Sequence, residues 1–121
     1  MAQYVEVVCN NIILTNRAKV IKSSLGRAKG LMFSKLGGTS GLIFELEKES
    51  RRNASIHMLF VFFKIDALWL DSSKRVVDIR RGLTPFIGFA RPKEKAKYVL
   101  ELQSGTAKTI KVGDVVEFRG E

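Results

Sequence analysis

The sequence is poor in the residues that build disulfide and metal sites. It holds one cysteine, one histidine, one tryptophan and two prolines among 121 residues. A single cysteine excludes an intrachain disulfide framework. One cysteine with one histidine also supplies too few ligands for a transition-metal site. We therefore expect neither a bound metal nor a cofactor.

Long hydrophobic runs are also missing. The most apolar stretch, residues 56–70, is interrupted by His57, Lys64 and Asp66. It is shorter than the roughly 20 apolar residues that span a bilayer. The first residues show no basic flank before an apolar stretch, so no signal peptide is expected. These observations predict a cytoplasmic protein without a transmembrane segment, and a single reduced cysteine agrees with that location.

Acidic residues are outnumbered by basic ones. Lysine and arginine number 21 and aspartate and glutamate 12, which gives a formal charge of +9. Such a field attracts nucleic acid or a phosphorylated ligand, although scattered cations are also typical of a solvated surface. Phe86 and Phe89 lie between basic groups, as in proteins that stack single-stranded bases. A nucleic-acid-binding face would use Arg80, Arg81, Arg91, Lys93, Lys95 and Lys97.

Apolar residues are plentiful and are arranged as short strands with turn signals between them. The hydrophobic content of 45% and the length fit one domain, residues 1–121, with its own core. Residues 54–63, apolar on both faces, indicate a central strand, whereas the charged residues 45–53 indicate an exposed segment. Strands are expected over 4–8, 12–14, 20–21, 42–44, 54–63, 65–70, 75–81, 97–103 and 115–118. Residues 9–12, with two asparagines, predict a tight hairpin turn, and Gly105 marks another turn.

One helix is expected among the strands. Leu25, Ala28, Leu31 and Met32 recur at spacings of three and four, after serines that can cap a helix. This spacing predicts a short helix over residues 23–33. The fold class is therefore mainly β (β-rich α+β), as a compact barrel or a rolled, mostly antiparallel sheet that removes exposed edges.

Three polar residues within apolar β segments are candidates for chemistry. His57 with Asp66 could act in a hydrolase-type enzyme, or the histidine could be a hydrogen-bonded structural residue. If Asp66 and Glu101 are buried together, one carboxyl would have a raised pKa; if each meets an arginine, both are structural. No nucleophile elbow or phosphate-binding loop completes a catalytic set. The absence of such a set favours a non-enzymatic domain.

Several short motifs, in a fixed order, resemble those of one family. The family has a Gly-Leu-Met segment, a Gly-Met-Leu-Phe strand, a central Trp-Met … Pro-Leu-Asp … Phe-x-Asp pattern and a closing Tyr-Val-Leu-Glu … Gly … Gly-Asp signature. The matching segments here are residues 28–33, 41–44, 57–58 with 65–66 and 70–71, and 98–102 with 105 and 112–114. The chain thus resembles, over about residues 15–118, the prokaryotic family catalogued as domain of unknown function one hundred and ninety-two.

The resemblance implies a compact, mostly β domain of bacteria and archaea without a settled biochemical activity. The family's signature polar positions fall on Asp66 and Glu101, and its signature apolar positions fall on Met32 and Met58. The family's tryptophan before the second methionine is His57 in this chain, so the resemblance departs at that position.

We therefore expect a small non-enzymatic β domain that binds a ligand or macromolecular partner. The binding site is expected near Asp66 and Glu101, with Met32 and Met58 contributing apolar contacts. Nucleic-acid binding through the basic face and hydrolase chemistry with His57 and Asp66 are the two alternatives.

Overall fold

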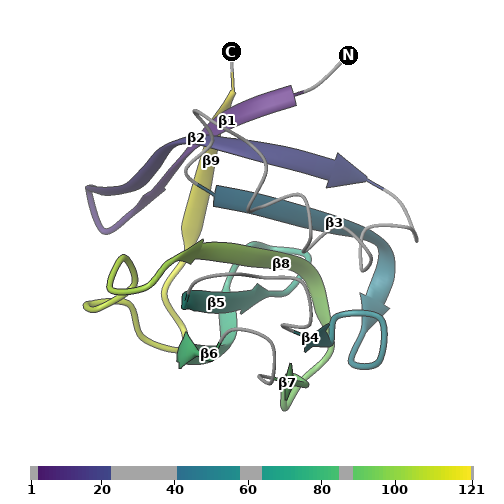
Figure 1. Cartoon of the computed structure of the whole chain (residues 1–121). Helices are drawn as coiled ribbons and strands as arrows, with labels where there is room; N and C mark the ends of the chain where they lie inside the picture. Colours follow the sequence, from purple (N-terminus) through teal and green to yellow (C-terminus); the bar gives the residue numbers. More distant parts are fainter. Residues whose placement is uncertain (1–2, 23–40, 58–63, 85–88, 121) are drawn as a thin grey trace.

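Nine β-strands make up the part of the chain that the computed structural model describes, residues 3–22, 41–57, 64–84 and 89–120 (Figure 1). The strands are β1 (Gln3–Cys9), β2 (Ile12–Lys22), β3 (Gly41–Ser50), β4 (Ile56–His57), β5 (Ile65–Leu70), β6 (Val76–Leu83), β7 (Phe89–Ala90), β8 (Ala96–Gln103) and β9 (Val116–Gly120). None of the described residues forms a helix of the length and hydrophobicity needed to cross a membrane.

Seven of these strands form one mixed sheet in the order β6-β5-β8-β3-β2-β1-β9, and β4 and β7 form a separate two-stranded ribbon. Within the large sheet, β2 and β3 pair in parallel and the other neighbours are antiparallel. The prediction of a mainly β, mostly antiparallel fold is therefore confirmed. The predicted helix over residues 23–33 lies outside the described residues.

The β1–β2 hairpin forms where the sequence predicts it. Asn10 and Asn11 both have positive φ angles, 54° and 63°, and they separate Cys9 from its partner Ile12. Two-residue hairpin turns need left-handed backbone, and asparagine tolerates it better than most residues with a side chain. The second arm then continues to Lys22, so the segments predicted at 12–14 and 20–21 are parts of one strand.

The large sheet is open, so the expectation of a closed barrel is wrong. Its edge strands β6 and β9 meet only at their beginnings, through an isolated bridge between Arg75 and Val115. There, the amide of Val76 donates to Asp114 O at 2.8 Å. The amide of Val116 donates to Lys74 O, in the β5–β6 turn, at 2.9 Å. Farther along β6, the neighbour is the loop between β8 and β9, so no continuous ladder closes the sheet.

Alternation along the strands sends side chains into two cores, one on each face of the large sheet. On β5, Leu68 and Leu70 belong to the first core, whereas Ile65, Ala67 and Trp69 belong to the second. Because β5 is buried on both faces, its sequence is almost continuously apolar. The first core also contains Val5, Val7, Cys9, Leu14, Ala18, Ile43, Val76, Leu100, Leu102, Ala107, Ile110 and Val116. The second also contains Leu42, Phe44, Leu46, Ala54, Ile56, Ala90, Ala96 and Val99.

Two segments differ from their predicted form. The charged segment after Phe44 continues β3 to Ser50, because β8 pairs with it at Glu45–Tyr98 and again at Ser50–Ala96, with an irregularity in the register between the two pairs. Residues 47–49 are nevertheless exposed, as their charges predict. In the expected central strand 54–63, the described β-structure is the two-residue β4, which pairs with β7 rather than joining the large sheet. Residues 58–63 lie outside the described residues.

Trp69 fixes the turn that precedes β4. Its indole Nε1 donates to Ala54 O at 2.7 Å, and the whole side chain is buried in the second core. Trp69→Phe removes this donor and leaves a buried carbonyl unpaired. We expect the substitution to lower the free energy of unfolding by about 2 to 4 kcal/mol. Urea unfolding followed by circular dichroism measures this, with the exposed Val112→Ala as control. A loss below about 0.5 kcal/mol, the range of ordinary surface substitutions, would contradict the role of Trp69.

Candidate functional site

Asp66 is a buried carboxylate whose oxygens are bonded to the main chain. It lies opposite Leu102 in the β5–β8 pair and is only 1% exposed. Its Oδ1 accepts the amide of Gly82 at 2.9 Å, and its Oδ2 accepts the amides of Gly105 at 2.9 Å and Ala107 at 3.2 Å. Both glycines have positive φ angles, of 68° and 94°, which other residues rarely adopt. Asp66 therefore joins β6 and the loop after β8 to the sheet.

Arg81 holds the same loop through its carbonyls. Its Nε and Nη2 donate to Ala107 O at 3.2 and 3.1 Å, and Nη2 also donates to Ile110 O at 2.6 Å. Ala107 and Ile110 are themselves buried in the first core. The loop is thus bound by a carboxylate at its amides and by a guanidinium at its carbonyls. Arg81, a candidate for the basic face, has a structural role in this geometry.

Glu101 lies on the opposite face of the sheet from Asp66. In register it is flanked by Leu42 of β3 and Ala67 of β5, both members of the second core. Glu101 is only 4% exposed, and its Oε1 is buried without a hydrogen-bond partner among the described residues. Burial in these apolar surroundings raises the pKa of Glu101 to about 7.

The structure therefore does not bring Asp66 and Glu101 together. Asp66 pairs with Leu102, and a shift of one position along β8 reverses the face to which a side chain points. Met32 and Met58, the expected apolar contacts, lie outside the described residues. The backbone of His57 belongs to β4, but its side chain is not among the described parts of the structure. Since both Asp66 oxygens bind amides, the geometry gives no support to its acting as the partner of a catalytic histidine.

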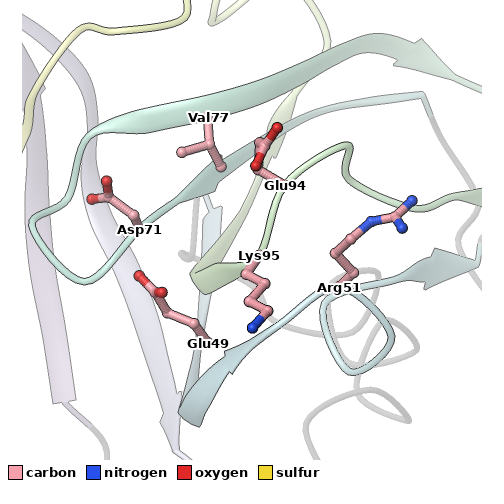
Figure 2. Close-up of a pocket in the computed structure, with 6 residues that line it drawn as sticks. All are labelled: Glu49, Arg51, Asp71, Val77, Glu94 and Lys95. Carbon is pink, nitrogen blue, oxygen red and sulfur yellow. The ribbon is translucent and has the colours of Figure 1, made fainter.

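An open cleft of about 440 Å³ lies where the end of β3, the β5–β6 turn and the segment before β8 approach one another (Figure 2). In the view of Figure 2, the carboxylates of Glu49 and Asp71 lie to the left of Lys95, that of Glu94 lies above it, and Arg51 lies to its right. The lining residues are Glu49, Arg51, Asp71, Val77, Glu94 and Lys95.

Much of this charged lining is already bonded within the protein. Glu49 Oε2 accepts both the amide and the hydroxyl of Ser72, at 2.9 and 3.0 Å. Asp71 Oδ1 accepts the amides of Ser73 and Arg75. In the part of the chain that the structure describes, no group of three or more acidic, histidine or cysteine side chains is placed to hold a metal ion. The hydrogen bonds of these lining carboxylates stabilise the turns around the cleft. Glu101 is therefore the better candidate for a ligand-binding residue.

Three arginines from separate elements converge on the segment between β7 and β8. Arg51 Nε donates to Pro92 O at 2.9 Å, and Arg80 Nη2 donates to Arg91 O at 3.5 Å. Arg91 Nε donates to Ser55 Oγ at 3.2 Å, and this hydroxyl in turn donates to Arg51 O at 3.3 Å. We call Arg51, Arg80 and Arg91 the arginine cluster. Sequence reasoning missed Arg51, because only the tertiary contact with Pro92 brings it to the others.

The remaining basic candidates are distributed around this cluster. Lys93 lies two residues after Arg91, and its amide donates to Oδ2 of the buried Asp78 at 2.9 Å. Asp78 Oδ2 also lies 3.8 Å from Arg80 Nη2, so Asp78 helps to fix the position of this member of the cluster. Lys97 Nζ donates to Glu47 O at 2.9 Å, and Lys95 lines the cleft.

Comparison with known proteins identifies the family. The model of the family DUF192, described as an uncharacterised ACR, matches residues 7–118. The chain belongs to the DUF192 family. The resemblance predicted from the sequence motifs is thereby confirmed, over slightly more of the chain than the motifs cover. Asp66 and Glu101, which carry the two carboxyls described above, both fall within the matched DUF192 region.

Archaeal relatives and a bacterial structure resemble this DUF192 chain. A UPF0127 protein of Thermococcus kodakarensis is 38% identical over 104 residues, which are 84% of this chain but only 64% of the relative's length. A UPF0127 protein of Pyrococcus horikoshii is 37% identical over 89% of this chain and 92% of its own. A crystal structure of a protein of unknown function from Novosphingobium aromaticivorans DSM 12444 is 28% identical, with a TM-score of 0.78 over 94% of this chain and 83% of that one. These DUF192 relatives indicate no specific function.

The anchoring role of Asp66 gives a stability prediction. Asp66→Asn places an amide nitrogen where at least one of the three main-chain donors now meets an oxygen. Hydrogen bonds to a charged group contribute roughly 1.5 to 3 kcal/mol each, so we expect a loss of at least about 3 kcal/mol. Thermal unfolding measures the loss, and Glu94→Gln, which replaces an exposed carboxyl by its amide, is the control. Equal melting temperatures for the two variants would refute the anchoring role.

Proposed function

We propose that this domain binds a small, largely apolar ligand that carries one amine or hydroxyl group, with Glu101 as the anchor for that group. The observation that carries the proposal is the buried Oε1 of Glu101, for which the described part of the chain offers no hydrogen-bond partner. Buried polar groups in folded proteins are nearly always paired, so an unpaired one needs an explanation. A group supplied by a ligand is the explanation that the surroundings of Glu101 support.

The energetic cost of this residue supports a functional role. Desolvation raises the pKa of Glu101 to about 7, so the protein bears a penalty whenever the carboxyl is ionised. An apolar side chain between Leu42 and Ala67 would avoid that penalty and would extend the second core. Residues that lower stability without an evident structural gain are characteristic of functional sites.

The neighbours of Glu101 indicate the class of ligand. Leu42, Ala67 and Val99 are apolar and belong to the same core, and Ala67 is the small residue directly beside the carboxyl on β5. Ligand sites typically combine apolar walls with a few polar groups that fix orientation. A carboxylate in a low-dielectric setting makes a strong, charge-assisted bond with an ammonium or hydroxyl donor. An apolar molecule with a single such donor matches both features.

The raised pKa predicts how stability depends on pH. The unfolded carboxyl titrates near 4.5 and the folded one near 7, so the folded state holds its proton more tightly. Stability from this group is complete below pH 4.5, falls as the pH rises from 4.5 to 7, and is lowest above 7. The total change is roughly 3 kcal/mol at about 1.4 kcal/mol per pKa unit. Glu101→Gln should remove this fall.

Urea unfolding of both proteins between pH 4 and 8.5 measures the difference. The stability of the wild type relative to Glu101→Gln should decline across that interval, and the exposed Glu94→Gln should follow the wild type. Parallel profiles for wild type and Glu101→Gln would show that Glu101 is not a buried acid in solution.

Binding itself is tested with straight-chain primary amines and the alcohols of equal length. At a concentration of a hundred dissociation constants, a bound amine stabilises the protein by about 2.7 kcal/mol, a shift of several degrees in melting temperature. Amine affinity should rise roughly tenfold per pH unit below 7 and level off above it, because only ionised Glu101 pairs with the ammonium group. Glu101→Gln should abolish the shift, while Glu94→Gln keeps it. No shift with any amine or alcohol at pH 8 would overturn the proposal.

A further inference from the structure

The aromatic side chain of Phe89 is exposed next to the arginine cluster. It is 60% exposed, although its neighbour Ala90 is buried in the second core. We propose that Phe89 and the arginine cluster together bind single-stranded nucleic acid, with the phenyl ring stacking on a base and the guanidinium groups contacting phosphates. This surface is carried by residues separate from Glu101 and does not depend on the ligand proposed above.

The orientation of Phe89 follows from the β4–β7 ribbon. Ile56 and Ala90 pair with one another and both pack into the second core. Side chains alternate along a strand, so Phe89 and Arg91 lie on the ribbon's other face, away from that core. The bond from Arg91 Nε to Ser55 Oγ lies on this same face and extends the ribbon by one further contact. A stacking ring and a guanidinium are thus two residues apart on one solvent-facing surface.

Two members of the arginine cluster, Arg51 and Arg91, are held in place by uncharged groups and keep their full charge. Arg51 and Arg91 each use Nε to bond an uncharged oxygen, at Pro92 and Ser55 respectively. A guanidinium has five N–H donors, and the described residues provide no partner for the two terminal nitrogens of Arg51 or Arg91, so these can contact a phosphate. Arg80 is 3.8 Å from the buried Asp78, which neutralises part of its charge and orders it. Because these contacts already order the arginine side chains, binding of an anion costs less side-chain conformational entropy.

Single-stranded nucleic acid fits this combination better than other anions do. A phosphorylated peptide would use the arginines but supplies no base to stack on the exposed aromatic ring. Bases in a duplex are already stacked, whereas an unpaired base offers its π face to a ring such as Phe89. The chain's +9 charge adds a long-range attraction for any polyanion, which speeds encounter.

Fluorescence anisotropy with labelled twelve-nucleotide oligo-dT and oligo-U, at low salt, tests the proposal. Phe89→Ala should weaken binding roughly 5- to 100-fold, since each stacked base contributes that much. The same substitution should leave the weak binding of a twelve-base-pair duplex unchanged. Arg51→Gln/Arg91→Gln should weaken oligonucleotide binding and flatten its dependence on salt, because fewer phosphate contacts release fewer counterions.

A matched control removes the same charge elsewhere. Lys108 and Lys111 are exposed on the loop between β8 and β9, so Lys108→Gln/Lys111→Gln loses two charges without touching the cluster. It should bind oligonucleotide within about twofold of the wild type. Circular dichroism and melting temperature confirm that each variant is folded.

Three results would overturn the proposal. The first is no binding of either oligonucleotide by the wild type at low salt. The second is equal losses in the Arg51/Arg91 and Lys108/Lys111 variants, which would indicate attraction by overall charge alone. The third is a Phe89→Ala variant that binds oligonucleotide like the wild type, which would leave a site for phosphate groups of any origin.

Discussion

The pairing of β5 with β8 determines what each buried carboxyl in this protein can do. Asp66 lies opposite Leu102, and Glu101 lies opposite Ala67, one position along each strand. The two acids are thus adjacent in the ladder but point to opposite faces of the sheet. A slip of β5 by one residue would turn Asp66 toward the second core, together with Leu68 and Leu70, which belong to the first. The dense apolar packing on both faces of β5 prevents such a slip.

The two carboxyls show how strongly the surroundings decide the role of one functional group. Asp66 accepts three main-chain amides, so its burial is compensated and it adds to stability. The Oε1 of Glu101 has no such donor, so burial is expressed as a raised pKa. The glycines at 82 and 105 account for part of the difference, because their left-handed backbone supplies amides to Asp66. Leu42 and Ala67, the register neighbours of Glu101 on either side, have β-strand amides that are used within the sheet.

Sequence reasoning recovered the features that depend on neighbouring residues. The asparagine turn between β1 and β2, the strand at Ile65–Leu70 and the turn at Gly105 follow from local composition and alternation. The charge of residues 47–49 predicted their exposure but not their place in β3, which continues past them because Ser50 pairs with Ala96 of β8. The sequence also indicated Asp66 and Glu101 as important carboxyls. Sequence reasoning assigned both carboxyls to one site. The strand register separates them, and register is set by tertiary contacts that the sequence alone does not show.

The same limit applies to the basic residues. Arg80, Arg81 and Arg91 are equivalent as charges in the sequence, yet Arg81 binds two loop carbonyls while Arg80 reaches Arg91. Neighbours along a strand face opposite ways, so a pair such as Arg80-Arg81 divides between two surfaces. Arg51 joins the cluster only because the turn after β3 approaches Pro92. Charge counting finds the total field, whereas the grouping of charges depends on the fold.

The second core connects the two proposed binding sites physically. Ile56 and Ala90 of the ribbon pack into the same core as Leu42 and Ala67, which flank Glu101. The position of Phe89 therefore depends on the packing that surrounds the buried carboxyl, and a substitution within this core would disturb both surfaces at once. Replacing Glu101 by glutamine keeps its volume, and replacing Phe89 alters a side chain that is mostly in solvent. These changes separate the sites because each removes one chemical group and leaves the shared core intact.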